Sequence, residues 1–216
     1  AAAQSGITVR QAAKLRALID RHSPEKPFGW IAVALSVPDW QLPAGILTRL
    51  EHRQCLPVRM LYQRFDHSVE EAVPLLPAHH RQQPLSYRET AALKALLLLD
   101  DWCRLTPVQK LEERYQLHLG QILALGETAA HLVNGIASVI EAGDLESPTV
   151  ALLRDLSYAL RHGVSSAVID LHRRFGDLLS RADLSVLGDA GITTTAELAE
   201  STQARLKQIL KDETKA

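Results

Sequence analysis

Apolar residues recur every three or four positions along most of the 216-residue chain, and this spacing predicts amphipathic helices. Helix starts carry a capping signal, in which Ser or Thr is followed three residues later by Glu or Gln. The hydroxyl accepts a backbone N–H that has no partner in the first helical turn, and the longer side chain reaches back. The signal occurs at Thr8 with Gln11, Ser68 with Glu71, Ser86 with Glu89, Thr106 with Gln109 and Thr194 with Glu197.

Together these patterns predict an almost wholly helical chain. Pro107 and Pro148 follow a Thr and a Ser, and we expect each at the first position of a helix, where the missing N–H costs nothing. Strand signals are weak and confined to residues 57–65, which we leave unassigned. The expected helices cover residues 8–22, 27–37, 43–53, 68–75, 86–104, 106–115, 118–125, 127–142, 148–162, 164–175, 180–188, 194–200 and 202–212.

The same patterns indicate how the chain is organised. Residues Leu93–Leu99 are apolar on nearly all sides, which predicts a buried central helix. Three prolines interrupt the pattern over Pro74–Ser86 and indicate an exposed loop. Near Phe175–Ser180 the long helices give way to short, glycine-punctuated ones. We therefore expect an all-α fold with two domains, a helical bundle over residues 1–175 and a small helical domain over residues 176–216.

Composition narrows the class of protein. Apolar residues make up 46% of the chain, but no run approaches the roughly 18 apolar residues of a membrane span, so we expect a soluble protein without a membrane partner. Cys55 and Cys103 lie far apart in sequence, which disfavours a thiol zinc site and suggests a reducing cytoplasm. The opening AAAQSG is not a signal peptide, and its lack of methionine favours a cut or processed chain.

No motif of a common enzyme class occurs. The chain has no GxxxxGK(S/T) phosphate loop, GxGxxG turn, HExxH helix or GxSxG elbow. The consecutive acids Asp100–Asp101 and Glu112–Glu113 point about 100° apart on a helix, so we interpret both pairs as solvated faces. His79 and His80 are adjacent, whereas zinc ligands converge from separate points. We predict no catalytic residue, no metal ligand and no cofactor.

Six segments occur in an order that resembles a known protein family. They are SGITVRQAAKLRALI (Ser5–Ile19), GWIAVALSVPDW (Gly29–Trp40), ALKALLLLDDWCRL (Ala92–Leu105), the run Tyr115–Ala142, RHGVSSAVIDL (Arg161–Leu171) and LGDAGITTTAELA (Leu187–Ala199). In this order they resemble the C-terminal accessory region of superfamily 2 DNA helicases of the archaeal Hel type. These helicases are kin to human helicase Q and the polymerase theta helicase.

The resemblance implies both a fold and a function. In that family a helical bundle follows the motor domains, its long ratchet helix touches the translocating strand, and a small helix-hairpin-helix domain comes next. By this likeness the chain is an accessory module that guides single-stranded or forked DNA in DNA repair. It would act with helicase motor domains in cis or in trans and would not hydrolyse ATP by itself.

The resemblance places the ratchet segment at Tyr115–Ala142. Positions spaced by three and four residues form one polar stripe that would face the strand: Glu127, His131, Asn134 and Ser138. The family usually has a tryptophan where His131 stands and an arginine near Ala124, and this sequence has neither. Stacking on an aromatic side chain contributes on the order of 1–3 kcal/mol per base, so we expect weaker strand binding than in the family, or a different contact surface.

The resemblance also gives the terminal domain a hairpin, whose glycine-rich turn holds a phosphate in a nest of backbone N–H groups. The matching stretch here is Phe175–Leu184, in which only Gly176 and Arg181 fit and in which Asp177 and Asp183 would oppose an anion. The formal net charge is −1, so any nucleic-acid contact must come from local basic clusters.

Two basic clusters are present. The first lies in the C-terminal half and holds Arg161, His162, Arg173, Arg174 and Arg181. The second, Arg49 to Arg64, is equally well interpreted as ordinary surface. The missing tryptophan, arginine and hairpin glycines favour an alternative function, a scaffold that docks a helicase or repair partner without touching DNA. The predicted nucleic-acid-binding residues are His131, Asn134, Ser138, Arg161, His162, Arg173, Arg174 and Arg181.

Overall fold

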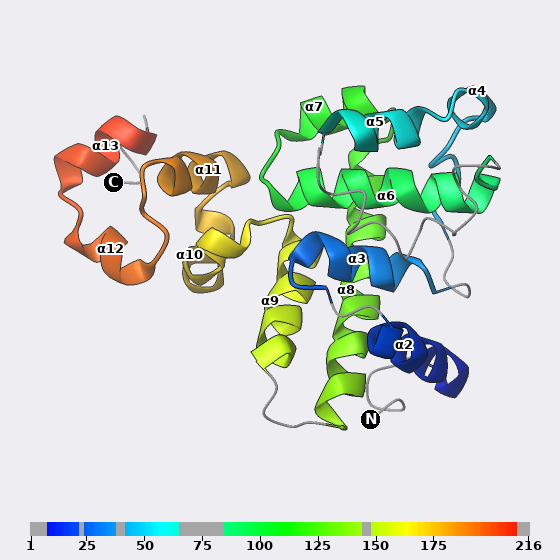
Figure 1. Cartoon of the computed structure of the whole chain (residues 1–216). Coiled ribbons are helices and arrows are strands. Elements are labelled where there is room, and N and C mark those ends of the chain that lie inside the picture. The colour runs from blue at the N-terminus through cyan, green and yellow to red at the C-terminus, as the bar shows by residue number, and fades with distance from the viewer. Residues whose placement is uncertain (1–7, 22–23, 38–41, 65–83, 144–147, 211–216) are drawn as a thin grey trace.

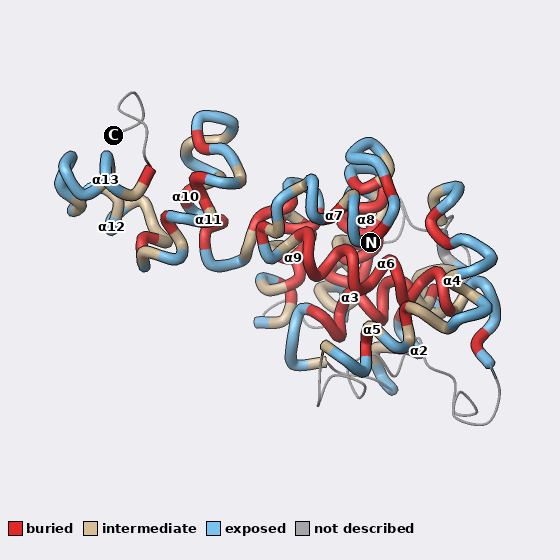
Figure 2. The backbone as a smooth tube through the Cα atoms, turned by 90° about the horizontal axis from the view of Figure 1, so that it is seen from above, coloured by how far each residue is buried: buried red, intermediate tan, exposed pale blue. Residues whose placement is uncertain are grey.

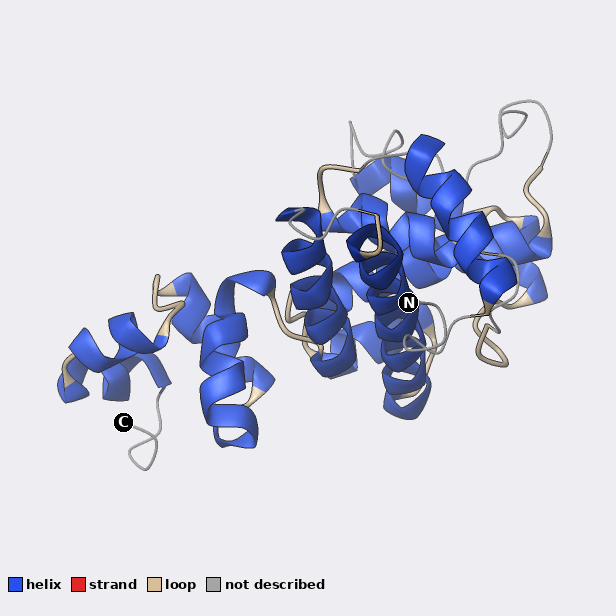
Figure 3. Ribbon diagram, turned by 90° about the horizontal axis from the view of Figure 1, so that it is seen from below, coloured by secondary structure: helices blue, strands red, loops and turns tan. Residues whose placement is uncertain are grey.

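The computed structural model describes residues 8–21, 24–37, 42–64, 84–143 and 148–210, and every regular element within these ranges is a helix. Figure 3 shows helices and loops and no strand in this part of the chain. The predicted all-α class is therefore confirmed.

The larger lobe of the molecule is a helical bundle in which α6 and α8 run through the middle (Figure 1). The helix pair α8 and α9 forms its most extensive contact, and α3 packs against both. The helices of this lobe are α2 (Val9–Arg21), α3 (Pro27–Leu35), α4 (Arg49–Arg53), α5 (Leu56–Arg64), α6 (Tyr87–Cys103), α7 (Val108–Tyr115), α8 (Leu119–Glu141) and α9 (Pro148–His162).

The α6 helix is the centre of the bundle. Every residue from Thr90 to Trp102 is buried, and this stretch is red along its length in Figure 2. The helices α3, α5, α7, α8 and α9 all pack against it. The buried central helix predicted from Leu93–Leu99 is confirmed, because a helix surrounded on all sides needs apolar residues on every face.

Two acids of α6 lie inside this core, so the predicted solvated face is wrong for Asp100 and Asp101. The carboxylate of Asp101 is hydrogen-bonded by the Tyr115 hydroxyl at 2.7 Å and by the Arg114 guanidinium at 2.8 Å. Arg64 of α5 forms ion pairs with both acids. A buried charge is tolerated only with such partners, so the two acids connect α5, α6 and α7 rather than face water.

Most of the predicted helix caps form. The box at Ser68 lies outside the described residues, and the one at Thr106 is wrong, because α7 begins at Val108 with Pro107 at the cap position. Thr106 instead belongs to the turn that closes α6, where its carbonyl accepts from Arg181. Reciprocal hydrogen bonds form in the boxes Thr8 with Gln11, Ser86 with Glu89 and Thr194 with Glu197.

Helix α8 is continuous where the sequence predicts two helices that meet at Gly126. A Cβ at Gly126 would lie 2.6 Å from the carbonyl oxygen of Leu160 in α9. The Trp102 indole N–H donates to that same carbonyl at 2.9 Å. Glycine weakens a helix by about 1 kcal/mol relative to alanine, but here it lets α9 approach closely. Helix α9 begins at Pro148, as predicted.

Among the described helices, α8 is long and apolar enough by length and composition to cross a membrane, which the search for apolar runs did not predict. However, 56% of the relevant stretch is buried inside the protein. A core helix of a soluble protein meets the same criterion, so α8 is only weak evidence for membrane insertion.

The unassigned residues 57–65 belong to helix α5 as far as Arg64. Pro57 sits in the first turn, where a helix tolerates proline. Pro57 and Leu61 are four residues apart and both buried, so α5 turns one apolar edge toward α6. The helix expected at residues 68–75 lies outside the described residues.

The elements after α9 build a second hydrophobic core, beside the bundle in Figure 1. Val164, Leu171 and Leu184 are fully buried in it. Its packing therefore groups α10 with the later helices, whereas the domain division predicted at residues 175 and 176 stays a prediction. The elements are η2 (Ser166–Val168), α10 (Ile169–Phe175), η3 (Gly176–Leu178), α11 (Arg181–Asp189), α12 (Thr195–Glu200) and α13 (Gln203–Leu210).

Candidate nucleic-acid interface

The polar stripe predicted on α8 lies along its contact with α9. Asn134 and Ser138 are half-buried, and Arg154 of α9 donates to the side-chain oxygens of both. Arg154 also pairs with Glu141 at 2.8 Å. Two of the residues predicted to face a strand are thus already hydrogen-bonded within the protein, whereas His131 remains exposed.

Two of the arginines predicted to bind nucleic acid form ion pairs at the protein surface. Arg161 lies 2.9 Å from Glu127 of α8, and Arg173 of α10 lies 2.7 Å from Asp155 of α9. All four side chains are about half exposed, at 48–59%. Exposed pairs of this kind contribute little to stability, so either arginine can exchange its carboxylate for another anion at low cost.

Three rings from α9 and α10 form a cluster beside these arginines. The centroid of the His162 ring lies 4.4 Å from that of Tyr158 and 5.0 Å from that of His172. The Tyr158 hydroxyl is hydrogen-bonded to His172 Nδ1 at 2.8 Å, and the Arg173 guanidinium lies 4.8 Å above the tyrosine ring. We call Tyr158, His162 and His172 the ring cluster.

Burial sets the charge of the ring cluster. It lowers the pKa of both His162 and His172 below the ordinary value of 6.5, and it outweighs the Asp177 carboxylate, which raises both; for His162, His172 and Arg161 lower the pKa further. Both imidazoles are therefore neutral at pH 7. A neutral ring with an exposed face, such as His162, is less strongly hydrated than an imidazolium and can stack on another π system.

A pocket of about 360 Å³ opens next to the ring cluster, where the bundle meets the second core. Helix α8 contributes Leu119 and Leu123, which are 38% and 45% exposed. We call this the junction pocket. The residues that define it are Trp102, Leu119, Leu123, His162, His172 and Asp177, with Arg161, Ser180 and Arg181 also in its wall.

Arg181 joins the two cores. Its guanidinium lies 3.8 Å above the Trp102 ring and donates to the carbonyls of Trp102 and Thr106, each at 3.1 Å. A Cβ at Gly163 would collide with both of these side chains. Burial lowers the pKa of Arg181 to about 10, so it stays charged at pH 7. We call Trp102, Thr106, Gly163 and Arg181 the inter-core contact. The Arg181 guanidinium, which the sequence predicts to bind phosphate, is already engaged in this contact.

Two charged side chains remain beside this region. Arg174 is exposed in the last turn of α10, and Asp177 is exposed in η3. Neither forms a hydrogen bond or ion pair within the described part of the chain. A cation at a helix C-terminus interacts favourably with the helix dipole. The position of Arg174 therefore has a structural explanation that needs no ligand.

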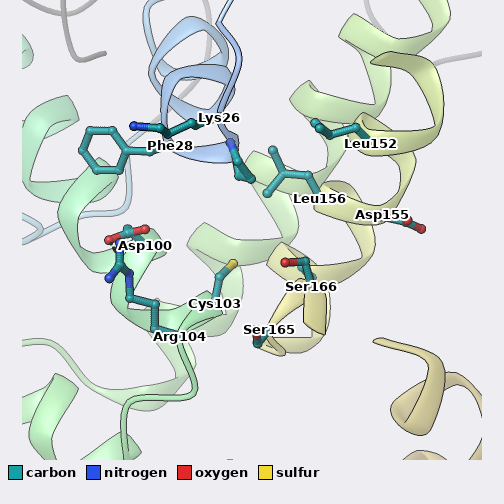
Figure 4. Close-up of a pocket in the computed structure, with 12 residues that line it drawn as sticks. Lys26, Phe28, Asp100, Cys103, Arg104, Leu152, Asp155, Leu156, Ser165 and Ser166 are labelled. Atoms are coloured by element: carbon teal, nitrogen blue, oxygen red, sulfur yellow. Dashed lines mark ion pairs between the residues drawn. The ribbon is translucent and has the colours of Figure 1, made fainter. Parts of the chain in front are cut away.

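A larger cavity of about 590 Å³ lies between α3, α6, α9 and η2 (Figure 4). The Cys103 sulfur points into it, and burial raises the pKa of that thiol to about 12, which leaves it protonated and unreactive. Asp100 in its wall pairs with Arg104 at 3.0 Å, and Asp155 points away from it. Within the described residues, no group of three His, Cys, Asp or Glu could hold a metal.

The structure brings Arg161, His162 and Arg173 together at the ends of α9 and α10, and Arg174 follows Arg173 in the last turn of α10. Sequence reasoning missed the residues that complete it. The spacing of four between Tyr158 and His162 was a usable signal, because it puts both rings on one helix face. His172 and Trp102 reach the region only through tertiary packing and had no such signal, whereas Asp177 was recognised only as a charge that opposes an anion.

No known protein-family model matches this chain. The likeness to superfamily 2 helicases therefore remains a hypothesis, and the candidate interface depends on its own geometry.

Proposed function

We propose that the chain binds single-stranded nucleic acid along the ends of α9 and α10, as a helical accessory module of a superfamily 2 DNA helicase. The observation that carries the proposal is the ring cluster flanked by arginines. It supplies the two things that a sequence-tolerant strand site needs, a π surface and cations beside it.

The exposed His162 ring is the stacking surface in this proposal. Tyr158 and His172 support it from within the protein and fix its position. An imidazole is smaller than an indole, so its share of the roughly 1–3 kcal/mol per stacked base lies at the lower end. This agrees with the expectation that strand binding is weaker than in the family, where a tryptophan stands on the ratchet helix.

The arginines supply the phosphate contacts. Arg174 has no ion pair to break within the described residues. Arg161 and Arg173 would each have to give up an ion pair with an exposed carboxylate. For single strands, each neutralised phosphate makes the logarithm of the affinity fall with the logarithm of the salt concentration by a slope of about 0.7. Three arginines therefore give a moderate affinity that salt weakens strongly.

The motor lies outside this chain in the proposal. The segment order is what supports an association with helicase motor domains, in cis or in trans, and the absence of a phosphate-loop motif is why we propose no ATP hydrolysis by the chain alone. An ATPase assay with and without single-stranded DNA checks this point, and turnover by the purified chain would contradict it.

Fluorescence anisotropy with a labelled oligonucleotide at two salt concentrations tests strand binding. Reversal of charge in Arg174→Glu is expected to weaken binding about tenfold and to reduce the salt slope by about 0.7. His162→Ala is expected to weaken binding about fivefold at both salt concentrations, and His162→Phe to restore it, because stacking depends little on salt.

The matched control is Lys207→Glu on α13, which makes the same change of charge on an exposed residue away from the ring cluster. It should bind as the unaltered chain does. Binding that is absent, independent of salt, or equally weakened by Lys207→Glu and Arg174→Glu contradicts the proposed interface.

The second candidate function is a scaffold that docks a helicase or repair partner without contacting nucleic acid. The observation in its favour is the group of exposed leucines near the junction pocket, Leu119, Leu123 and the 73% exposed Leu178. Reversal of both Arg173 and Arg174 separates the candidates. Strand binding that is absent from the unaltered chain or unchanged in that variant, together with capture of purified motor domains that Leu178→Glu abolishes, favours the scaffold.

A further inference from the structure

The junction pocket differs in character from the arginine-flanked surface beside it. Its wall combines exposed leucines of α8 with the imidazoles of the ring cluster and with the carboxylate of Asp177. Its volume of about 360 Å³ is near the lower end of the roughly 300–1,000 Å³ of small-molecule pockets. Such a space fits a ligand of about the size of one nucleotide.

The charge at the pocket decides which part of a nucleotide can enter. Asp177 is an exposed carboxylate without a hydrogen bond or ion pair in the described residues, so it repels a phosphate. The wall also holds the guanidinium groups of Arg161 and Arg181, but Arg161 pairs with Glu127 and Arg181 stacks on Trp102. Asp177 is thus the charged side chain of the wall that has no partner in the described residues, and the orientation that suits it puts the base inward and the phosphate at the rim.

The remaining groups suit a flat aromatic ligand. Leu119 and Leu123 lie on successive turns of α8 and give an apolar surface, and His162 and His172 give π surfaces. Bases taken out of a stack are held in this way, between apolar or aromatic side chains that leave their hydrogen-bonding edge free. Asp177 and Ser180 can then reach that edge.

We infer that the junction pocket binds one unstacked nucleobase that carries an exocyclic amino group, with the base between the leucines of α8 and the imidazoles and its amino group donating to Asp177. A carboxylate only accepts hydrogen bonds, which matches the N4 amino group of cytosine and not the O4 carbonyl of uracil or thymine. The inference rests on the proposed function and deepens it, because it adds base selection in a pocket beside the strand surface.

Two mononucleotides of equal charge and nearly equal shape test the inference on the full chain. Cytidine 5′-monophosphate and uridine 5′-monophosphate are titrated separately, and the carbon-bound ring protons of the histidines are followed by NMR. Cytidine 5′-monophosphate is expected to shift the signals of His162 and His172 and to bind about tenfold more tightly than uridine 5′-monophosphate. Ribose 5-phosphate, which has no base, is expected to shift neither.

Three variants show where the base binds. Asp177→Asn offers the base both a donor and an acceptor, so it should bring the two affinities to within about twofold. Leu123→Glu places charge in the apolar wall and should abolish both titrations. Leu178→Glu, with a residue outside the pocket wall, is the matched control and should leave both titrations unchanged.

The results separate this inference from the proposed function. Equal affinities for the two nucleotides, or shifts that persist in Leu123→Glu, overturn the inference even where the chain binds an oligonucleotide through Arg174. Shifts by cytidine 5′-monophosphate in a chain that binds no oligonucleotide support the pocket and refute the strand interface. If no nucleotide shifts the histidine ring-proton signals and a protein partner shields them, the inference is overturned in favour of docking.

Discussion

Two of the three rings in the ring cluster are imidazoles that burial keeps from being protonated. Burial is the main cause of the lowered pKa of His162 and His172, and for His162 the neighbouring imidazole and Arg161 add to it. In the unfolded chain both groups have the ordinary pKa of 6.5. Below that pH the unfolded chain therefore binds more protons than the folded one.

The two rings therefore make the protein less stable as the pH falls. The stability that the two rings contribute is fully present above about pH 6.5 and is lost as the pH falls toward their lower folded pKa. Urea unfolding at about pH 7.5 and 5.5 measures this. The double variant His162→Gln and His172→Gln should lose less stability between the two pH values than the unaltered chain does.

His131→Gln is the matched control, because His131 is exposed on α8 and outside the ring cluster. Its pH profile should match that of the unaltered chain. Parallel profiles for the double variant and the unaltered chain would falsify the assignment, because carboxylates elsewhere would then account for the whole acid effect.

The sequence identified the charged residues of the site better than it identified the groups with which they pair. It selected Arg161, Arg173 and Arg181 from local density of charge, but an arginine's availability depends on what folds beside it. Arg161 meets Glu127 and Arg181 meets Trp102, which are 34 and 79 residues away in sequence. Only tertiary contacts decide such pairings, so no local pattern could have shown that Arg181 joins two cores.

Helix α8 contains a matched pair of glycines that separates helix propensity from packing. At Gly120, in the first turn, a Cβ would meet nothing within 4 Å, whereas at Gly126 it would lie 2.6 Å from the Leu160 carbonyl oxygen. Gly120→Ala should stabilise the chain by about 0.5 kcal/mol, through helix propensity alone.

Gly126→Ala gains the same propensity but forces α8 and α9 apart. Overpacking costs about 1–3 kcal/mol, and loss of the Trp102 hydrogen bond to Leu160 adds about 1 kcal/mol. We expect a net loss of about 1–3 kcal/mol in the free energy of unfolding, measured by urea titration. A Gly126→Ala chain as stable as the Gly120→Ala chain is the outcome that refutes close helix approach as the reason for this glycine.

Elements were predictable where one local rule acts without competition. The capping boxes at Ser86 and Thr194 and the all-round apolar run of α6 have no rival interpretation, and they formed as expected. Gly126 was misinterpreted because a glycine that permits close packing looks like one that ends a helix. The cap at Thr106 failed because the turn after α6 uses that residue for tertiary contacts.

The described part of the molecule has two hydrophobic cores. One fills the bundle, and the other lies among the helices from α10 to α13 and takes in Leu105 and Ala159 from the bundle. The inter-core contact is a stacked guanidinium, whose Nε and Nη1 atoms are buried without a hydrogen-bond partner. Its attraction therefore depends on the Trp102 ring face and two carbonyls, and a shift of either core weakens all of these interactions together.

Gly163 makes this contact possible and offers a way to loosen it. Its backbone has a φ of +64°, and the space where a Cβ would project is filled by Trp102 and Arg181. Gly163→Ala should cost about 2–4 kcal/mol, from left-handed strain plus displacement of the two side chains. Gly176→Ala, at a φ of +53° and a ψ of −130° with open space around it, should cost only the backbone strain, about 1–3 kcal/mol.

Hydrogen exchange shows how far this effect spreads through the molecule. If the inter-core contact couples the cores, Gly163→Ala should speed exchange in α10 and α11 while the middle of α6 keeps its protection, because Leu93 and Leu96–Leu99 are buried in the other core. Gly176→Ala should change α10 only near its end. Equal loss of protection in α6 and α11 of the Gly163→Ala chain would mean that the two cores unfold as one unit, and that the Trp102–Arg181 stack is one contact among many.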